Sequence, residues 1–301
     1  NNFNSDLQFK VLKCFSYTET EDAYDAIKQL LLTNPPFSEK NSKLLFFDNL
    51  YDSLELSENY FPEMLDMAQY SDYHPYILEI LASGYLQEIY TFDNFKSRKS
   101  TIFRNATIEL KRTVANQNSD DYYKNSFDYG GYGYSDQNES YHSLFLDYYT
   151  LMCGFKVYGD KEADQFFKDI YRIEDKKFKI EAQIIHHKLG LDVDSAVINE
   201  VYRDVELRVW VYNRLADNEM MKFADPEIKQ KDIAFALLYK SGYDEEKDTV
   251  EFIKTVKVNS GKEQGTIYFF KRKSENKRNW MVDYVGLLPT DKSNFNSDGH
   301  S

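Results

Sequence analysis

The stretch NSKLLFFDNLYDSLELSENYFPEMLDMAQYSDYHPYILEILASG, residues 41–84, sets the plan for most of the chain. Apolar residues recur in it at intervals of three or four, as in the run Phe61, Met64, Leu65 and Ala68. This spacing predicts short amphipathic helices, each with one apolar stripe. The last block has Pro75 at its start and Gly84 just past its predicted end, an asymmetry that helices favour. Short helices joined by short loops must pack on one another, so we expect an α-helical array.

Composition and periodicity divide the chain into five segments. The segments are an N-terminal helical array over 1–115, a Gly/Tyr/Asn-rich loop or linker over 116–140, a second helical array over 141–242, a β meander over 249–288 and a disordered tail over 289–301. Within the second array we expect a single helix over 195–215, with Asp194 or Ser195 as its N-cap. A single helix is also expected over 92–115.

The last structured segment changes period from helical to alternating. Apolar residues on one parity, followed by two turns, predict a three-stranded antiparallel meander. In the first strand that parity holds Val250, Phe252, Val256 and Val258. In the third it holds Trp280, Val282 and Tyr284. A small sheet with one apolar face needs cover, so we expect it to pack on the last helices or on something outside the chain. The predicted fold class is mainly α, with α-solenoid-like stacked helical hairpins and this small sheet.

Charge and cysteine content limit the partners. The chain of 301 residues has a net charge of −13, which argues against nucleic acid or an anionic membrane as the main partner. No run of 18 apolar residues is present, so no transmembrane segment is expected. Cys14 and Cys153 are either buried thiols or one disulfide. Because the chain begins at Asn1, we expect a processed protein or part of a longer one, and the missing signal peptide carries no weight.

No motif predicts a catalytic, metal or cofactor site. His186 and His187 are adjacent, whereas a helical zinc pair needs histidines four apart on one face. The acids Asp192 and Asp194 resemble a calcium loop, but Val197 occupies the position that requires glycine. There is no G-x-S-x-G elbow for a nucleophile. The alternative that stays open is a hydrolase-type enzyme with a pocket between the two helical halves.

Two groups of residues are candidate protein-contact sites. The aromatic loop provides Tyr129, Tyr132 and Tyr134, and the β hairpin provides Phe270, Lys271, Arg272, Lys273, Lys277, Arg278 and Trp280. The hairpin cluster is basic in an acidic chain, so it can pair with an acidic protein surface or a phosphate group. The alternatives are a mobile connection for the loop, and for the lysines a role in discouraging strand-to-strand aggregation.

The succession of helical pairs over 3–115 and over 141–240 resembles HEAT-like or related α-solenoid repeats. The tetratricopeptide consensus is not matched, and no fixed repeat period can be laid down. The segments IELKRTVA (108–115) and GTIYFFKRKSENKRNWMVDYVGLLP (265–289) are similar to parts of large cell-envelope proteins of gliding, type IX-secreting bacteria. This resemblance implies a periplasmic or cell-envelope interaction module; the cytoplasm is the alternative location.

We therefore expect a non-catalytic protein–protein interaction module. It would be an accessory subunit, scaffold or docking region of a larger assembly, such as a membrane-associated secretion complex. Helical arrays present extended faces built from many helices, which suits that role.

Overall fold

The structure, a computed structural model, forms two compact units. One unit comprises Asn1–Gly133 with Tyr141–Leu191, and the other comprises Tyr134–Ser140 with Asp192–Ser301. The structure describes residues 74–117, 144–240, 248–260, 263–274 and 279–288, and before them only residues 10, 11, 14, 15, 18, 20, 22, 23, 25–27, 29, 50, 51 and 54–57. The predicted linker beyond residue 117 and the predicted tail 289–301 lie outside the described residues.

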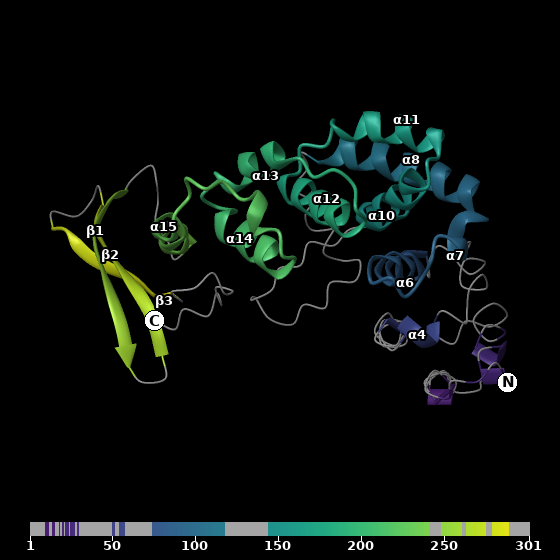
Figure 1. Cartoon of the computed structure of the whole chain (residues 1–301), viewed down its shortest axis with the longest axis horizontal. Helices are drawn as coiled ribbons and strands as arrows, with labels where there is room; N and C mark the ends of the chain where they lie inside the picture. Colours follow the sequence, from purple (N-terminus) through teal and green to yellow (C-terminus); the bar gives the residue numbers. More distant parts are fainter. Residues whose placement is uncertain are drawn as a thin grey trace. The chain divides into compact units, whose positions relative to one another are not determined.

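All the regular secondary structure in the described part of the N-terminal unit is helical. Its helices are α4 (Leu54–Ser57), α6 (His74–Leu86), α7 (Asp93–Lys96), α8 (Lys99–Asn116), α10 (Leu144–Val157), α11 (Lys161–Ile170) and α12 (Lys176–Lys188). Helix α10 is the centre of this unit, because it packs against α6, α8, α11 and α12 (Figure 1). Every residue from Phe145 to Phe155 is buried. A helix that is apolar on all sides can be stable only when neighbours surround it.

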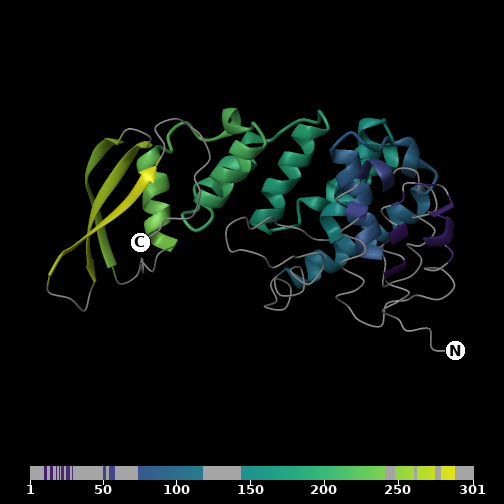
Figure 2. The same ribbon diagram turned by 90° about the horizontal axis from the view of Figure 1, so that it is seen from below.

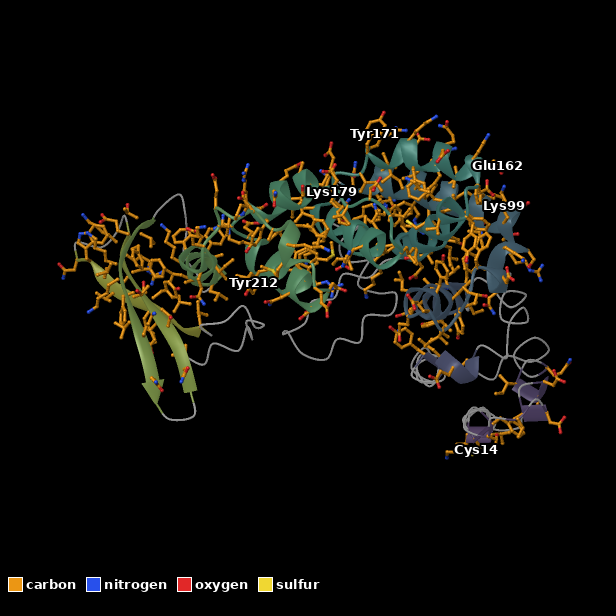
Figure 3. All side chains as sticks on the ribbon, viewed as in Figure 1. Cys14, Lys99, Glu162, Tyr171, Lys179 and Tyr212 are labelled. Atoms are coloured by element: carbon orange, nitrogen blue, oxygen red, sulfur yellow. The ribbon has the colours of Figure 1, made fainter. Side chains whose placement is uncertain are left out.

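Helices α8 and α11 are joined at both ends. At their starts, the Nζ of Lys99 lies 2.6 Å from Asp160 Oδ2 and 3.1 Å from Glu162 Oε2. Figure 3 shows Lys99 and Glu162 close together at this end. At the other end, the Gln117 amide donates to the carbonyl of Arg172 at 3.2 Å and accepts from the amide of Glu174 at 2.8 Å. The two helices therefore run in the same direction.

Gly84 does not end its helix as predicted; α6 continues to Leu86. The ring of the buried Tyr90 lies so close to Gly84 that a Cβ there would overlap it. The Tyr90 hydroxyl donates a hydrogen bond to the carbonyl of Leu54 at 3.0 Å, which fixes the ring. Glycine is needed here for the close approach of an aromatic ring, and the sequence pattern had suggested a cap instead.

Other predicted helix ends are confirmed by their capping contacts. Asp194 is the N-cap of α13 (Ser195–Tyr202) and accepts from the amide of Ala196 at 2.9 Å. Helix α12 ends at Gly190 as expected, with φ at 69°. The Leu191 amide donates back to the carbonyl of His186 at 2.8 Å, which satisfies an orphan carbonyl of the last turn.

Two predicted helices are each divided in two. The expected helix over 92–115 is α7 followed by α8. The expected helix over 195–215 is α13 followed by α14 (Arg208–Asp217). At the second break, the Arg208 guanidinium donates to the carbonyls of Tyr202, Arg203 and Asp232 at 3.3, 2.7 and 3.3 Å. A side chain that satisfies the carbonyls at the end of α13 lets the chain turn there, and apolar spacing alone does not reveal this.

The C-terminal unit adds η2 (Met221–Phe223), α15 (Gln230–Lys240) and the strands β1 (Asp248–Ser260), β2 (Glu263–Ser274) and β3 (Met281–Leu288). The strands form one antiparallel sheet in the order β1-β2-β3, and α15 packs beside β3 (Figure 2). The mainly helical fold class with a C-terminal three-stranded antiparallel sheet is confirmed. The solenoid-like stacking of hairpins stays a prediction.

A β-bulge corrects the predicted face of the first strand. The register between β1 and β2 shifts between Phe252 and Lys254. One extra residue moves every later side chain to the opposite face. Val250 and Phe252 therefore lie opposite Arg272 and Phe270 on one face, and Val256, opposite Ile267, lies on the other. The four valine and phenylalanine residues expected on one side are divided between two.

Two further expectations concern membranes and cysteines. Among the residues that the structure describes, no helix combines the length and apolar character needed to cross a bilayer. Cys14 is an exposed free thiol and Cys153 a buried one, so they form no disulfide with each other. Burial raises the pKa of the Cys153 thiol, and it therefore stays protonated at neutral pH.

Candidate functional site

The C-terminal sheet has two chemically different faces. We call the face toward α15 the inner face: Tyr268 donates a hydrogen bond to Gln230 Oε1 at 2.5 Å, and the ring of Phe270 lies 6.2 Å from that of Phe235. Side chains alternate along a strand, so Ile267, Phe269, Lys271 and Lys273 lie on the opposite side, the outer face. α15 supplies the cover that the small sheet was expected to need, but only for the inner face.

The third strand presents its apolar stripe on the outer face. Val282 and Tyr284 lie opposite Lys271 and Phe269 of β2, and their side chains are 64% and 62% exposed. Trp280, just before β3, is 43% exposed, and its ring lies 4.5 Å from the Nζ of Lys271. The sequence pattern had suggested that these three residues form the covered side. Exposed large apolar side chains gathered on one face are typical of an interaction surface.

The outer face has an apolar band that crosses the three strands diagonally. It runs from Val282 and Tyr284 on β3, through Phe269 and Ile267 on β2, to Val256 on β1. The rings of Phe269 and Tyr284 are 6.2 Å apart. Leu287 adds to the band, because its side chain lies against the position that a Cβ at Gly265 would occupy.

Three lysines border this band on one side. Lys254 is opposite Phe269, with its Nζ 5.7 Å from the ring centroid. Lys271 pairs with Glu251 at 2.6 Å, and Lys273 is exposed opposite Thr249. Three cations and the single carboxylate of Glu251 leave this border positive among the described residues. We refer to the band and its lysines as the outer sheet site.

The structure brings together only some of the predicted contact residues. Lys271, Lys273 and Trp280 lie in the outer sheet site. Phe270 is 2% exposed in the core between sheet and α15, so a partner cannot reach its ring. Arg272 is on the inner face, where its Nε lies 2.9 Å from Asp283 Oδ2 without the alignment of a hydrogen bond. Because side chains alternate along a strand, Phe270 and Arg272 lie on the inner face and their neighbours Lys271 and Lys273 lie on the outer face. Tyr129, Tyr132, Tyr134, Lys277 and Arg278 lie outside the described residues.

The sequence interpretation missed Lys254, Val256, Phe269, Val282 and Tyr284 as members of the site. Lys254 was visible as the residue that interrupts the alternation of the first strand. Such an interruption is a signal of a bulge, which would have moved Val256 to the outer face. Alternation along β3 could not show which of its two sides is covered. It separates Val282 and Tyr284 from Met281, Asp283 and Val285, but it does not indicate which set faces α15.

The N-terminal unit contains a polar cluster on three helices. The hydroxyl of the buried Tyr148 on α10 is hydrogen-bonded to His74 Nε2 on α6, and Asn105 of α8 also hydrogen-bonds it. Burial lowers the pKa of His74 and raises that of Tyr148. Glu109 lies nearby on α8 with its pKa raised by burial. Such a cluster joins the three helices α6, α8 and α10.

A shallow groove of about 250 Å³ lies between the later part of α8 and the end of α11. Leu110, Val114 and Ala115 provide an aliphatic floor, and Lys111, Asp169 and Arg172 provide charges of both signs. Arg172 follows the last turn of α11, where a cation complements the helix dipole. The mixture of charges defines no ligand class.

Of the adjacent histidines His186 and His187, His186 packs against a buried tyrosine. His186 Nε2 lies 2.7 Å from the Tyr149 hydroxyl, and the two rings are stacked 5.9 Å apart. Among the described residues, no group of three or more His, Cys, Asp and Glu side chains is arranged to hold a metal ion. The hydrolase-type alternative stays a prediction.

Comparison with known proteins adds no relative: no protein-family model matches the chain, and neither the curated proteins nor the solved structures contain a match.

Proposed function

We propose that this protein is a non-catalytic protein–protein interaction module that binds its partner through the outer sheet site. The observation that carries the proposal is the exposed apolar stripe of β3, where Val282 and Tyr284 are 64% and 62% exposed on the face opposite α15. Tyr and Trp are enriched at protein interfaces because they bury a large apolar area and keep a polar group at the edge.

Charge supports a protein partner with an acidic surface. Residues 248–288 contain eight basic and five acidic residues, whereas the whole chain has a net charge of −13. A basic segment in an acidic protein attracts an acidic partner to that segment and disfavours other orientations. The role of an accessory subunit or docking region in a larger assembly, in the cell envelope by the resemblance of 108–115 and 265–289, is part of the same proposal.

Photo-crosslinking tests the proposal. A photoreactive phenylalanine analogue would replace Tyr284 in one variant and Tyr171 in another, each in the source cell. Tyr171 is a matched control because it is 82% exposed and points away from the end of α11 (Figure 3). We expect a discrete, stoichiometric partner at position 284 and none at 171.

The complex with that partner would then be reconstituted from purified proteins. We expect Tyr284→Ser to weaken binding about 30-fold, as for a central aromatic of an interface, and Tyr171→Ser to leave it unchanged. Circular dichroism of both variants would verify the fold. Equal losses in the two variants, or no discrete product at position 284, would contradict the proposal.

A further inference from the structure

The outer sheet site has the dimensions of one helix. Three strands span two interstrand spacings, about 9.5 Å, which is close to the 10 Å diameter of a helix. The inner face already provides an example, since a single helix, α15, packs there through Phe235 against Phe270. A wider partner, such as a second sheet, would extend beyond the strands on both sides.

The apolar band has the direction and length that a crossing helix requires. It rises from Val282, opposite Lys271, to Val256, opposite Ile267, while crossing from β3 to β1. At 3.3 Å per residue along the strands and 4.8 Å between them, this diagonal and its flanking residues are on the order of 20 Å long. A helix of about four turns, roughly 15 residues, covers that distance.

The charges specify the polar residues of that helix. Lys254, Lys271 and Lys273 all lie along one side of the band, and Glu251 is their single acidic neighbour on this face within the described strands. Lys257, by contrast, is opposite Thr266 and belongs to the inner face. A helix in the band would therefore be favoured by acidic residues beside its apolar stripe.

We infer that the outer sheet site binds one acidic amphipathic helix of about four turns from the partner protein. This inference rests on the proposed function and names the chemistry of the partner. The helix places an apolar stripe on Phe269, Val282 and Tyr284 and its carboxylates beside Lys254 and Lys273. Lys271 stays over the ring of Trp280 and contributes charge at the same border.

Model peptides test the inference with the full-length chain. The first is a 15-residue helix with leucines at intervals of three and four and glutamates beside them. The second is a scrambled peptide of the same composition, and the third carries lysines in place of glutamates. The protein contains two tryptophans, Trp210 and Trp280. In a Trp210→Phe variant, fluorescence therefore reports peptide binding at Trp280 alone.

We expect the acidic helical peptide to bind at least about tenfold more tightly than the scrambled peptide. The double variant Lys254→Glu with Lys273→Glu should weaken the acidic peptide by about tenfold and strengthen the lysine peptide. Lys257→Glu is the matched control, because it adds the same charge change to β1 on the inner face, and it should change binding less than twofold.

Three results would overturn the inference. They are equal binding of the scrambled peptide, equal effects of the outer-face and inner-face charge reversals, and a peptide-free dimer in sedimentation that Tyr284→Ser dissociates. The last result would mean that a second copy of the chain covers the face. If position 284 crosslinks to a natural partner while the acidic helix fails to bind, the proposed function stands and the helix inference falls.

Discussion

His74 illustrates how one buried residue links stability to pH. Burial lowers its pKa below the ordinary value of 6.5, because the charged form loses hydration that the hydrogen bond with Tyr148 does not replace. The unfolded chain therefore binds a proton at a higher pH than the folded chain does. The free energy of unfolding must fall as the pH drops through 6.5 and level off below the folded pKa.

We predict that His74→Gln reduces this pH dependence. Urea unfolding of both proteins would be followed at pH 7.5 and at about pH 5.5, a window above the ordinary pKa values of Asp and Glu side chains. The unmutated protein should lose more stability across this window than the variant does. Identical losses would mean that His74 becomes charged as readily in the folded chain as in the unfolded one.

At the scale of the element, the last turn of α6 packs against the ring of Tyr90, which follows it in the chain. Amides of Ile89 and Tyr90 both donate to the carbonyl of Gly84 at 3.0 Å, which turns the chain so that the Tyr90 ring lies on the helix. The hydroxyl of that ring reaches Leu54. The glycine, the turn and the buried tyrosine therefore form one structural unit.

We predict that Gly84→Ala destabilises the protein by about 1–2 kcal/mol. Overpacking against a fixed ring costs about 1–3 kcal/mol, and the better helix propensity of alanine, up to about 1 kcal/mol, offsets part of it. Urea unfolding would measure the change. In a Tyr90→Leu background the same substitution should be neutral or stabilising, because the ring is gone. A cost that is the same in both backgrounds would show that the ring is not the cause.

The sheet shows how strand register decides which residues belong to the outer sheet site. On β2, Phe269 and Lys271 belong to the outer sheet site, whereas Phe270 and Arg272 belong to the core and its border with Asp283. A single bulged residue in β1 decides whether Val256 joins them. Register therefore distributes the hairpin residues between the outer sheet site and the core.

At the scale of the whole molecule, each unit has its own core. A cluster of buried residues around α10 consists of residues of the N-terminal unit, such as Leu151 and Phe155. Both tryptophans belong to the C-terminal unit, whereas most described helical residues belong to the N-terminal unit. Tryptophan fluorescence therefore reports on the C-terminal unit, and the helical circular dichroism signal reports mainly on the N-terminal unit.

We predict that the units unfold separately. Leu151 and Leu215 are both fully buried, one in α10 and one in α14. Leu151→Ala should cost about 2–5 kcal/mol and shift the main circular dichroism transition in urea, with the fluorescence transition unchanged. Leu215→Ala is the matched control and should shift the fluorescence transition. A single transition that both substitutions shift equally by both probes would contradict the prediction.

The helical class, the sheet at the C-terminal end and several helix boundaries could be predicted from the sequence alone. These features depend on local rules: apolar spacing, the carboxylate of Asp194 at an N-cap and the left-handed backbone of Gly190. The basic character of the hairpin was also visible, and with it Lys271, Lys273 and Trp280 as candidate contacts. Local signals are strong when the residues that interact are close in the chain.

The division of the hairpin residues between the outer sheet site and the core could not be predicted from the sequence. The bulge after Phe252, the position of α15 and the ring of Tyr90 on Gly84 all depend on contacts between distant segments. Alternation indicates that a strand has two faces, but the face that is covered depends on the element that packs against it. For this reason Val282 and Tyr284, which the pattern assigned to a covered side, are the most exposed apolar residues of the sheet.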